Sequence, residues 1–257
     1  MILVLDIGNT NVTLGVYDNK KLLFVSRLAT DRSRMEDQYM LELRDILNIY
    51  GLSSDKIDGA AISSVVPCVT TAYINAIKRL TGAKIVCVGP NVKTGITVSA
   101  ANRNTIGADL ITGCAAAALL YDGPYIVLDM GTATTFMLVD ENKNLIGGAI
   151  APGVGISLDA LVGHAARLTA IDLKAPAQVI GRNTVECMST GIVNGTVYMI
   201  DGMCDHMEEE LGRKCCVVAT GGLSCEIVKH CSRDINYCGT LLLDGLRIIY
   251  EMNASEN

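Results

Sequence analysis

The feature that most constrains this chain is an Asp-x-Gly motif that occurs twice. One apolar run ends at Asp6 and another ends at Asp129, 123 positions later. In each copy small hydroxyl or amide residues follow, and a second apolar run then begins. The pattern predicts a strand, a tight turn and a second strand, used twice. Such a turn can bring backbone N–H groups close to phosphate oxygens, and a carboxylate at the strand end can hold a hydrated divalent cation. Two such turns facing each other would clamp a nucleoside triphosphate.

Composition and charge exclude several classes of protein. Half of the 257 residues are hydrophobic, so the chain can bury a substantial core. Trp is absent and Phe occurs twice, which disfavours an aromatic platform for nucleic acid. The net charge is −6 and no run of Lys or Arg exceeds two residues, so we expect neither a nucleic-acid partner nor a membrane surface. The first residues already follow a strand pattern and no apolar stretch is long enough to cross a bilayer. We therefore expect a soluble cytoplasmic protein.

The ten cysteines do not have the spacing of a metal site or a disulfide framework. The sequence has no Cys-x-x-Cys pair, and the adjacent Cys215 and Cys216 would point to opposite faces of a strand. His164, His206 and His230 are far apart in the sequence. We therefore expect reduced thiols that pack as small hydrophobic side chains.

Hydrophobic periodicity predicts two α/β halves, 1–118 and 119–257, with a nucleotide cleft between them. Each half begins with the strand hairpin and continues with helices and strands. The predicted helices are 36–50, 69–80, 108–121, 156–168, 184–211, 223–231 and 241–252. The predicted strands outside the first hairpin are 57–66, 84–88, 125–129, 135–139, 145–150 and 215–219.

Several motifs along the chain resemble the type III pantothenate kinases. They are 6–11, Gly107-Ala108-Asp109, 129–135, 152–157, 181–184 and Thr220-Gly221-Gly222, in the order and spacing of that family. The resemblance implies a fold of two duplicated ribonuclease H-like domains with mixed sheets, as in the actin, sugar kinase and Hsp70 superfamily. The competing P-loop motif is absent, and 153–158 lacks the third small residue of a dinucleotide fingerprint.

The resemblance implies an ATP site. Asp6 would hold Mg²⁺, and Asp129 would coordinate a monovalent cation, K⁺ or NH₄⁺. The residues that would contact ATP are Asp6, Ile7, Gly8, Asn9, Thr10, Asn11, Val12, Thr13, Thr132, Gly221 and Gly222. Taken singly, each motif also has an ordinary structural explanation, such as a type I turn or a strand-to-helix turn, and the residue types do not separate K⁺ from Mg²⁺.

Asp109 stands at the predicted start of a helix. A carboxylate there can simply balance the helix dipole. By resemblance it is the general base that accepts the proton of the pantothenate hydroxyl. The helix terminus favours the ionised form, which predicts a weak, deprotonated base. The resemblance places Gly107, Ala108, Asp109, Leu110 and Thr184 at the acceptor, with Thr184 reaching it across a homodimer interface.

The chain departs from the family pattern at the acceptor. The family usually has Arg where this chain has Leu110, and Tyr where it has Ala100. Replacing Arg by Leu removes a fixed cation. Arg103 or Arg182 could supply the missing charge.

Three hypotheses follow. The first is ATP-dependent phosphorylation of pantothenate to 4'-phosphopantothenate, the first step of coenzyme A biosynthesis. The second is a kinase of the same fold that acts on another small hydroxyl compound, and the third is a catalytically silent nucleotide-binding paralogue with a regulatory role. The presence of Asp109 favours the first two.

Overall fold

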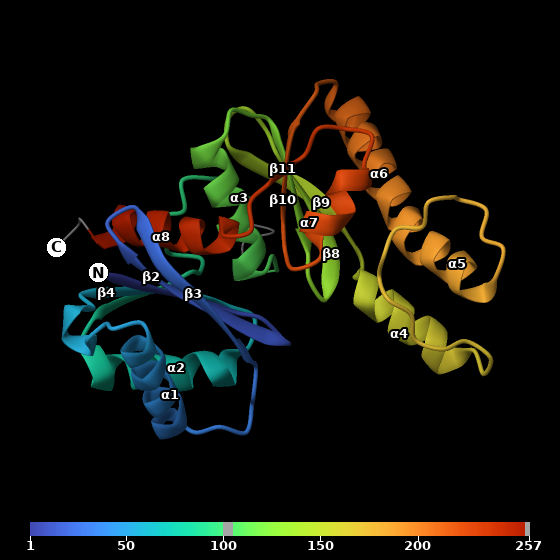
Figure 1. Ribbon diagram of the computed structural model, residues 1–257. Coiled ribbons are helices and arrows are strands. Elements are labelled where there is room, and N and C mark those ends of the chain that lie inside the picture. Colours follow the sequence, from blue (N-terminus) through green and yellow to red (C-terminus); the bar gives the residue numbers. More distant parts are fainter. Residues whose placement is uncertain (100–104, 255–257) are drawn as a thin grey trace. The chain divides into compact units, whose positions relative to one another are not determined.

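The computed structural model describes residues 1–99 and 105–254. Its chain divides into two compact units, each an α/β structure with a mixed sheet (Figure 1). Unit 1 consists of Met1–Leu119 and Leu241–Asn257, and unit 2 of Leu120–Thr240.

The sheet of unit 1 has the strand order β3-β2-β1-β4-β5. β2 pairs antiparallel with both β1 and β3, whereas β4 pairs parallel with both β1 and β5. The strands of the unit are β1 (Ile2–Ile7), β2 (Asn11–Asp18), β3 (Lys21–Ala29), β4 (Gly59–Ser64), β5 (Lys84–Cys87) and the short β6 (Thr97–Val98). The helices are α1 (Glu36–Ile49), the 3₁₀ turn η1 (Ser54–Lys56), α2 (Pro67–Thr81), α3 (Ala108–Leu120) and α8 (Leu241–Ala254).

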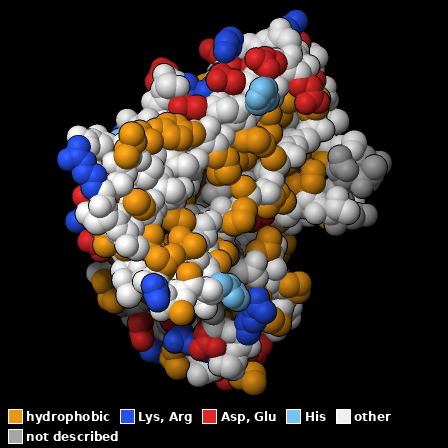
Figure 2. All heavy atoms as spheres, turned by 90° about the vertical axis from the view of Figure 1, so that its right-hand side faces the viewer, with side chains coloured by type: hydrophobic (Ala, Val, Ile, Leu, Met, Phe, Trp, Pro, Cys, Tyr) orange, Lys and Arg blue, Asp and Glu red, His pale blue; other side chains and the backbone are white. Residues whose placement is uncertain are grey.

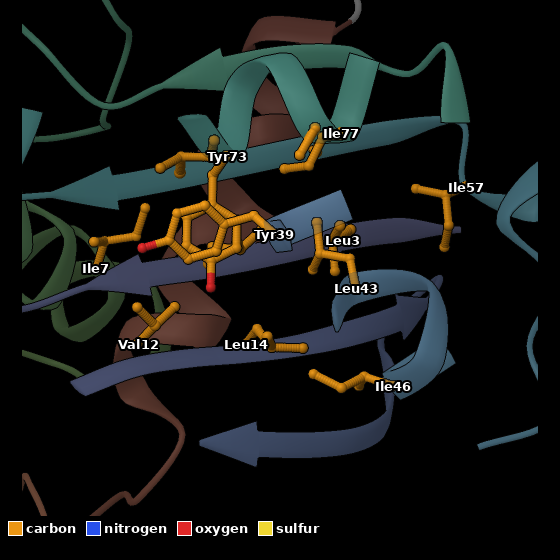
Figure 3. Close-up of a cluster of buried hydrophobic side chains, with 14 of the residues drawn as sticks. Leu3, Ile7, Val12, Leu14, Tyr39, Leu43, Ile46, Ile57, Tyr73 and Ile77 are labelled. Atoms are coloured by element: carbon orange, nitrogen blue, oxygen red, sulfur yellow. The ribbon is translucent and has the colours of Figure 1, made fainter. Parts of the chain in front are cut away.

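Helices α1 and α2 cover one face of this sheet. Their buried residues recur every three or four positions, so each helix presents one apolar stripe. The rings of Tyr39 and Tyr73 are tilted by 35° with their centroids 4.2 Å apart, in the buried cluster that also holds Leu3 and Ile7 of β1 (Figure 3). Helix α2 begins with Pro67 in its first turn and ends at Gly82, which has a left-handed φ of 68°. This packing anchors β1 beneath the first Asp-x-Gly turn.

Helix α8 covers the opposite face. Its Leu243 and Leu246 pack with Val4 of β1 and Ala61 of β4. These contacts group α8 with unit 1, although the sequence division at 118/119 assigns it to the second half. Helix α8 is the last element of the chain and is far in sequence from β1 and β4. Its position in the sequence therefore does not predict which sheet it covers, and only the packing of its apolar stripe shows this. The predicted division into two duplicated halves, 1–118 and 119–257, stays a prediction. The nucleotide cleft between them also stays a prediction.

The sheet of unit 2 repeats the connectivity of unit 1. The strands that unit 2 itself supplies follow the order β11-β10-β7-β8-β9, with β8 antiparallel to both β7 and β9 and β10 parallel to both β7 and β11. The strands are β7 (Tyr125–Met130), β8 (Ala133–Val139), β9 (Asn144–Pro152), β10 (Cys216–Thr220) and β11 (Asn236–Tyr237). The helices are α4 (Val154–His164), α5 (Thr184–Ser189), the π-helix η2 (Thr190–Asn194), α6 (Gly195–Leu211), α7 (Ser224–Ile227) and the 3₁₀ turn η3 (Val228–His230). The repeated connectivity confirms the predicted fold of two mixed-sheet α/β domains.

Two differences from the predicted elements have clear physical reasons. The strand β3 was not predicted, because it lies at the sheet edge and its side chains are mostly exposed or half-buried, which blurs the alternation. The helix predicted over 184–211 is divided by the π-turn η2, which local apolar periodicity does not reveal.

All ten cysteines are free thiols in the structure. Cys114 and Cys204 are fully buried, and burial raises the pKa of Cys114 to about 12 and that of Cys204 to about 11. Among residues 1–99 and 105–254, no helix is both long enough and apolar enough to cross a membrane.

A buried carboxylate ties α6 to the strand that follows it. Glu208 accepts hydrogen bonds from Lys214 Nζ (2.7 Å), Arg233 Nη2 (3.0 Å) and the Cys215 N–H (3.0 Å). Burial by itself would raise the pKa of Glu208, but the bonds from Arg233, Lys214 and Cys215 outweigh it and lower the pKa to about 2. The ionised side chain therefore stabilises the fold above its ordinary pKa of 4.5, and this contribution is lost as the pH falls toward 2.

We expect Glu208→Gln to lower the free energy of unfolding at pH 7 by about 1–3 kcal/mol, because Arg233 and Lys214 lose a charged acceptor. The variant should also lose part of the acid dependence of stability between pH 4.5 and 2. Urea unfolding across this pH range measures both effects. Glu210 is an exposed neighbour of Glu208 and serves as the control. Its substitution, Glu210→Gln, should change the free energy of unfolding by less than about 0.5 kcal/mol. Equal effects of the two substitutions would contradict the assigned role of Glu208.

Candidate functional site

The first predicted turn follows the central strand of unit 1. Asp6, half-buried near the end of β1, pairs in register with Thr13 on β2 and with Ser63 on β4. Residues directly opposite each other on neighbouring strands point to the same face of a sheet, so two hydroxyl groups flank the Asp6 carboxylate. Asp6 and Thr13 were predicted from the sequence, whereas Ser63 was not, because the pairing between β1 and β4 is not visible in local sequence.

Backbone bonds and a neighbouring segment hold the turn after Asp6. The Gly8 N–H donates to the Asn11 carbonyl (2.9 Å). Thr30 donates from its N–H to the Thr10 carbonyl (2.9 Å) and from Oγ1 to the Gly8 carbonyl (2.7 Å). Arg32 Nη2 donates to Asn9 Oδ1 (2.9 Å). Thr30 and Arg32 were not predicted, since they belong to a different strand end.

The exposure of the turn residues separates side chains that can reach a ligand from those that cannot. Asn9, Thr10 and Asn11 are exposed, whereas Ile7 and Val12 are fully buried in the core beneath the turn. Ile7 and Val12 can therefore offer a ligand only their backbone groups.

The predicted acceptor residues begin α3 at the same end of the unit 1 sheet. A side chain at Gly107 would overlap the Asp109 carboxylate and would come within 3.5 Å of Val65, which directly follows β4. β1 and β4 are parallel with Ile7 opposite Ser64, so their carboxyl ends lie together. The structure thus brings Asp6, the first turn and Asp109 to one edge of one sheet.

The electrostatics of Asp109 differ from the sequence expectation. Burial raises the pKa of its carboxyl above the ordinary value of 3.8, and the hydrogen bond from the Leu110 N–H (2.8 Å) lowers it only in part. The helix N-terminus alone predicts the opposite direction, and that prediction is wrong because desolvation of the charged form is the larger effect. A raised pKa makes Asp109 a stronger base when it is ionised.

The second turn follows the central strand of unit 2 with the same register. Asp129, half-buried near the end of β7, pairs with Thr135 on β8 and Thr220 on β10. The Gly131 N–H donates to the Ala133 carbonyl (3.0 Å), and the Gly153 N–H donates to the Thr132 carbonyl (3.1 Å). Thr132 itself is exposed. The match to Asp6, Thr13 and Ser63 shows that the duplication extends to the hydroxyls beside each carboxylate.

Gly221 lies directly against the end of β7. Its φ is +100°, and a Cβ atom there would be 2.5 Å from the Met130 carbonyl oxygen. Both facts require glycine, because other residues rarely adopt this φ and the neighbour is backbone that cannot move away. Gly222 is exposed beside it. The predicted Gly-Gly pair thus lies at the second turn.

Thr184 lies on a separate element of unit 2. It is exposed in the first turn of α5, where the Asn183 side chain accepts from the Glu186 N–H (3.0 Å) and Glu186 accepts from the Arg182 N–H (2.8 Å). Arg182 is also exposed, so its guanidinium is open to solvent. Ala100 and Arg103 lie outside the described residues.

Comparison with known proteins decides the family. The family model of type III pantothenate kinases matches residues 2–206. A type III pantothenate kinase from Moorella thermoacetica is 42% identical over 254 residues, which is 99% of this chain and 100% of that protein. The chain belongs to the type III pantothenate kinase family. It is therefore a kinase, a phosphotransferase, whose family works on ATP with a divalent metal.

Solved structures of low identity show the same fold. A Campylobacter jejuni protein described as a Baf family transcriptional activator superimposes with a TM-score of 0.65 at 19% identity, covering 98% of both chains. A Sinorhizobium meliloti protein described as a 2-dehydro-3-deoxygalactonokinase superimposes with a TM-score of 0.60 at 12% identity, covering 99% of this chain and 100% of the other. Both show that this type III pantothenate kinase family member shares its fold with these proteins over nearly its whole length.

The donor set at Asp6 fits a magnesium ion. Among residues 1–99 and 105–254, no three His, Cys, Asp or Glu side chains converge in a cage that could hold a metal. Mg²⁺ usually binds through one or two carboxylates and completes its shell with phosphate oxygens and water. A single carboxylate beside hydroxyls and an exposed turn suits a metal that arrives with ATP.

We expect Gly221→Ala to destabilise unit 2 by more than about 1 kcal/mol and to weaken ATP binding, because the new methyl group overlaps the Met130 backbone at the second turn. Thermal unfolding and calorimetric titration with ATP measure the two effects. Gly202→Ala on α6 is the matched control, since a Cβ there meets nothing within 4 Å. It should leave ATP affinity unchanged and stabilise the helix by about 0.5–1 kcal/mol. Normal stability and ATP affinity of Gly221→Ala would refute this account.

Proposed function

We propose that this kinase phosphorylates pantothenate with ATP to give 4'-phosphopantothenate, the first step of coenzyme A biosynthesis. The observation that carries the proposal is the placement of Asp109 at the start of α3, at the sheet edge that also holds Asp6 and the first turn. Relatives that match this chain over nearly its whole length are type III pantothenate kinases, which supports the choice of acceptor.

The residues of the first turn would bind the metal and the phosphates of ATP. Asp6 would hold Mg²⁺, whose charge offsets that of the β- and γ-phosphates, and the N–H groups of residues 8–13 would bind phosphate oxygens. In unit 2, Asp129 would hold a monovalent cation, K⁺ or NH₄⁺, and Thr132 would contact ATP. The backbone at Gly221 and Gly222 would lie against the adenosine.

Asp109 would accept the proton of the pantothenate hydroxyl. Phosphoryl transfer passes through a loose transition state, so the base has to orient the hydroxyl and accept its proton late. A raised pKa suits this role, because the proton transfer becomes more favourable while the carboxylate still ionises. Gly107 leaves the space in which the Asp109 carboxylate lies.

Leu110 supports a second candidate function. Its half-buried apolar side chain stands where the family usually has Arg, so a donor that would hold pantothenate is missing. A kinase of the same fold for another small hydroxyl compound is therefore the alternative. A catalytically silent paralogue ranks third. Such a protein would not need a partly buried carboxyl at position 109, whose ionised form is disfavoured by burial.

We also propose that the protein is a homodimer and works in the cytoplasm. Unit 2 exposes several large apolar side chains, which gather on the side that carries α4, α5 and α6 (Figure 2). They include Ile150, Ile156, Val179, Ile180, Val185 and Tyr198. Clustered exposed apolar side chains are typical of protein interfaces. Thr184 is exposed next to Val185 in the chain, which supports its expected reach into the acceptor site of the partner. Ten free thiols are in keeping with a reducing compartment.

We expect Asp109→Asn to reduce pantothenate-dependent ADP release at least about 100-fold while ATP affinity stays nearly unchanged. The assay contains ATP, Mg²⁺ and K⁺, with pantothenate or one of a panel of small alcohols. ADP release that occurs with pantothenate and not with the other alcohols supports the first function. ADP release that occurs only with another alcohol supports the second. Nucleotide binding without release in any mixture would leave the silent paralogue.

The pH dependence of the unchanged protein supplies a check on Asp109. The folded pKa is raised, so activity should be lost as the pH falls through a value above 3.8. The sign for stability is opposite, because a carboxyl with a raised folded pKa stabilises the fold at low pH and loses that contribution as the pH rises. Asp109→Asn should therefore be at least as stable as the unchanged protein at neutral pH. Near-normal turnover of the variant would remove Asp109 from the role of base.

We expect Ile180→Lys to weaken the dimer and to lower pantothenate kinase activity with it, because a charge would be buried at the apolar interface. Sedimentation velocity at several protein concentrations measures the association. Ile49→Lys on α1 is the matched control, since Ile49 is 79% exposed and Ile180 is 82% exposed. It should leave both association and activity unchanged. A fully active monomer would contradict the proposed role of the interface.

A further inference from the structure

Ser63 carries a buried hydroxyl with no hydrogen-bond partner. Its side chain is fully buried, and its Oγ atom makes no hydrogen bond in the described structure. An unpaired hydroxyl in a core costs stability, since water satisfied it in the unfolded chain. Packing alone would be served better by alanine. We therefore expect the Ser63 hydroxyl to gain a hydrogen-bond partner in another state of the protein, such as a ligand-bound state.

The neighbouring Ser64 shows what a structural serine looks like at this place. Ser64 Oγ accepts from the Val66 N–H (3.0 Å) and from Thr70 Oγ1 (2.6 Å), which ties the end of β4 to the start of α2. Successive residues of a strand point to opposite faces. Ser63 therefore points away from α2 and shares its face with Asp6.

The strand register places the Asp6 carboxylate beside Ser63, on the same face of the sheet. The two residues are directly paired on parallel strands, which run about 4.8 Å apart. Thr13 flanks Asp6 on the other side, but it is only half-buried, so water can satisfy its hydroxyl. Unit 2 repeats the arrangement with a hydroxyl residue, Thr220, beside Asp129.

We propose that Ser63 is a positioning residue for the metal site. In the nucleotide-bound state its hydroxyl donates a hydrogen bond to the Asp6 carboxylate and fixes it for Mg²⁺. The inference rests on the proposed function, in which Asp6 holds the Mg²⁺ that accompanies ATP. Hydrogen bonds to a ligating carboxylate orient it, and their loss typically costs about 10–100-fold in metal affinity.

The test compares Ser63→Ala with Ser64→Ala. Isothermal titration measures the affinity for Mg²⁺ in the presence of a non-hydrolysable ATP analogue, and thermal unfolding measures the stability of the protein without ligand. Ser63→Ala should weaken Mg²⁺ binding about 10–100-fold and leave the melting temperature unchanged or raised. Ser64→Ala should lower the melting temperature and leave Mg²⁺ affinity unchanged. Ser63→Thr, which keeps the hydroxyl, should restore Mg²⁺ binding.

Several outcomes would overturn the proposal. Mg²⁺ affinity of Ser63→Ala within twofold of the unchanged protein would do so, as would a lower melting temperature with normal Mg²⁺ affinity. The proposal would also be overturned if the unchanged protein bound nucleotide equally well without a divalent metal. Failure of the proposed function looks different, since the protein would then bind Mg²⁺ and nucleotide but would not phosphorylate pantothenate.

Discussion

The register between each central strand and its two neighbours is the constraint on which the candidate site depends. It places Asp6 between Thr13 and Ser63, and Asp129 between Thr135 and Thr220. A shift of one residue would turn each carboxylate to the opposite face, where the apolar core lies. Because Leu5, Ile7, Leu128 and Met130 fill those cores, burial of the alternate residues holds the register. The stability of the core and the placement of the polar groups thus have one cause.

Asp109 in unit 1 shows a competition between two electrostatic effects. A helix N-terminus favours an ionised Asp109, and burial disfavours it, with burial the larger effect. Glu208 shows the reverse outcome, since Arg233, Lys214 and a backbone N–H outweigh its burial. Glu208 is reached by two cationic side chains, whereas, within the described residues, Asp109 receives hydrogen bonds only from backbone N–H groups. The Asp109 carboxyl thus has a raised pKa and the Glu208 carboxyl a lowered one, and Glu208 joins α6 to the chain that follows it.

Unit 2 combines a rigid turn with an apolar surface. Gly153 and Gly221 let backbone segments approach the second turn more closely than any side chain would allow. The turn is therefore held by backbone packing, which does not depend on which side chains surround it. The exposed apolar residues near α4 and α5 are a separate feature, of the kind that is typical of protein interfaces.

The sequence by itself determined the duplicated fold, the family, and the positions of Asp6, Asp129 and Asp109 at element ends. These features depend on local patterns, namely apolar periodicity, Asp-x-Gly turns and a helix start, and such patterns are present in short stretches of residues. Only the tertiary structure showed that Ser63 and Thr220 flank the carboxylates, that Thr30 and Arg32 support the first turn, and that α8 packs on the first sheet. It also decided the direction of the Asp109 pKa. Each of these depends on residues far apart in the chain, and the pairing of parallel strands and the loss of water around a side chain exist only once the chain has folded.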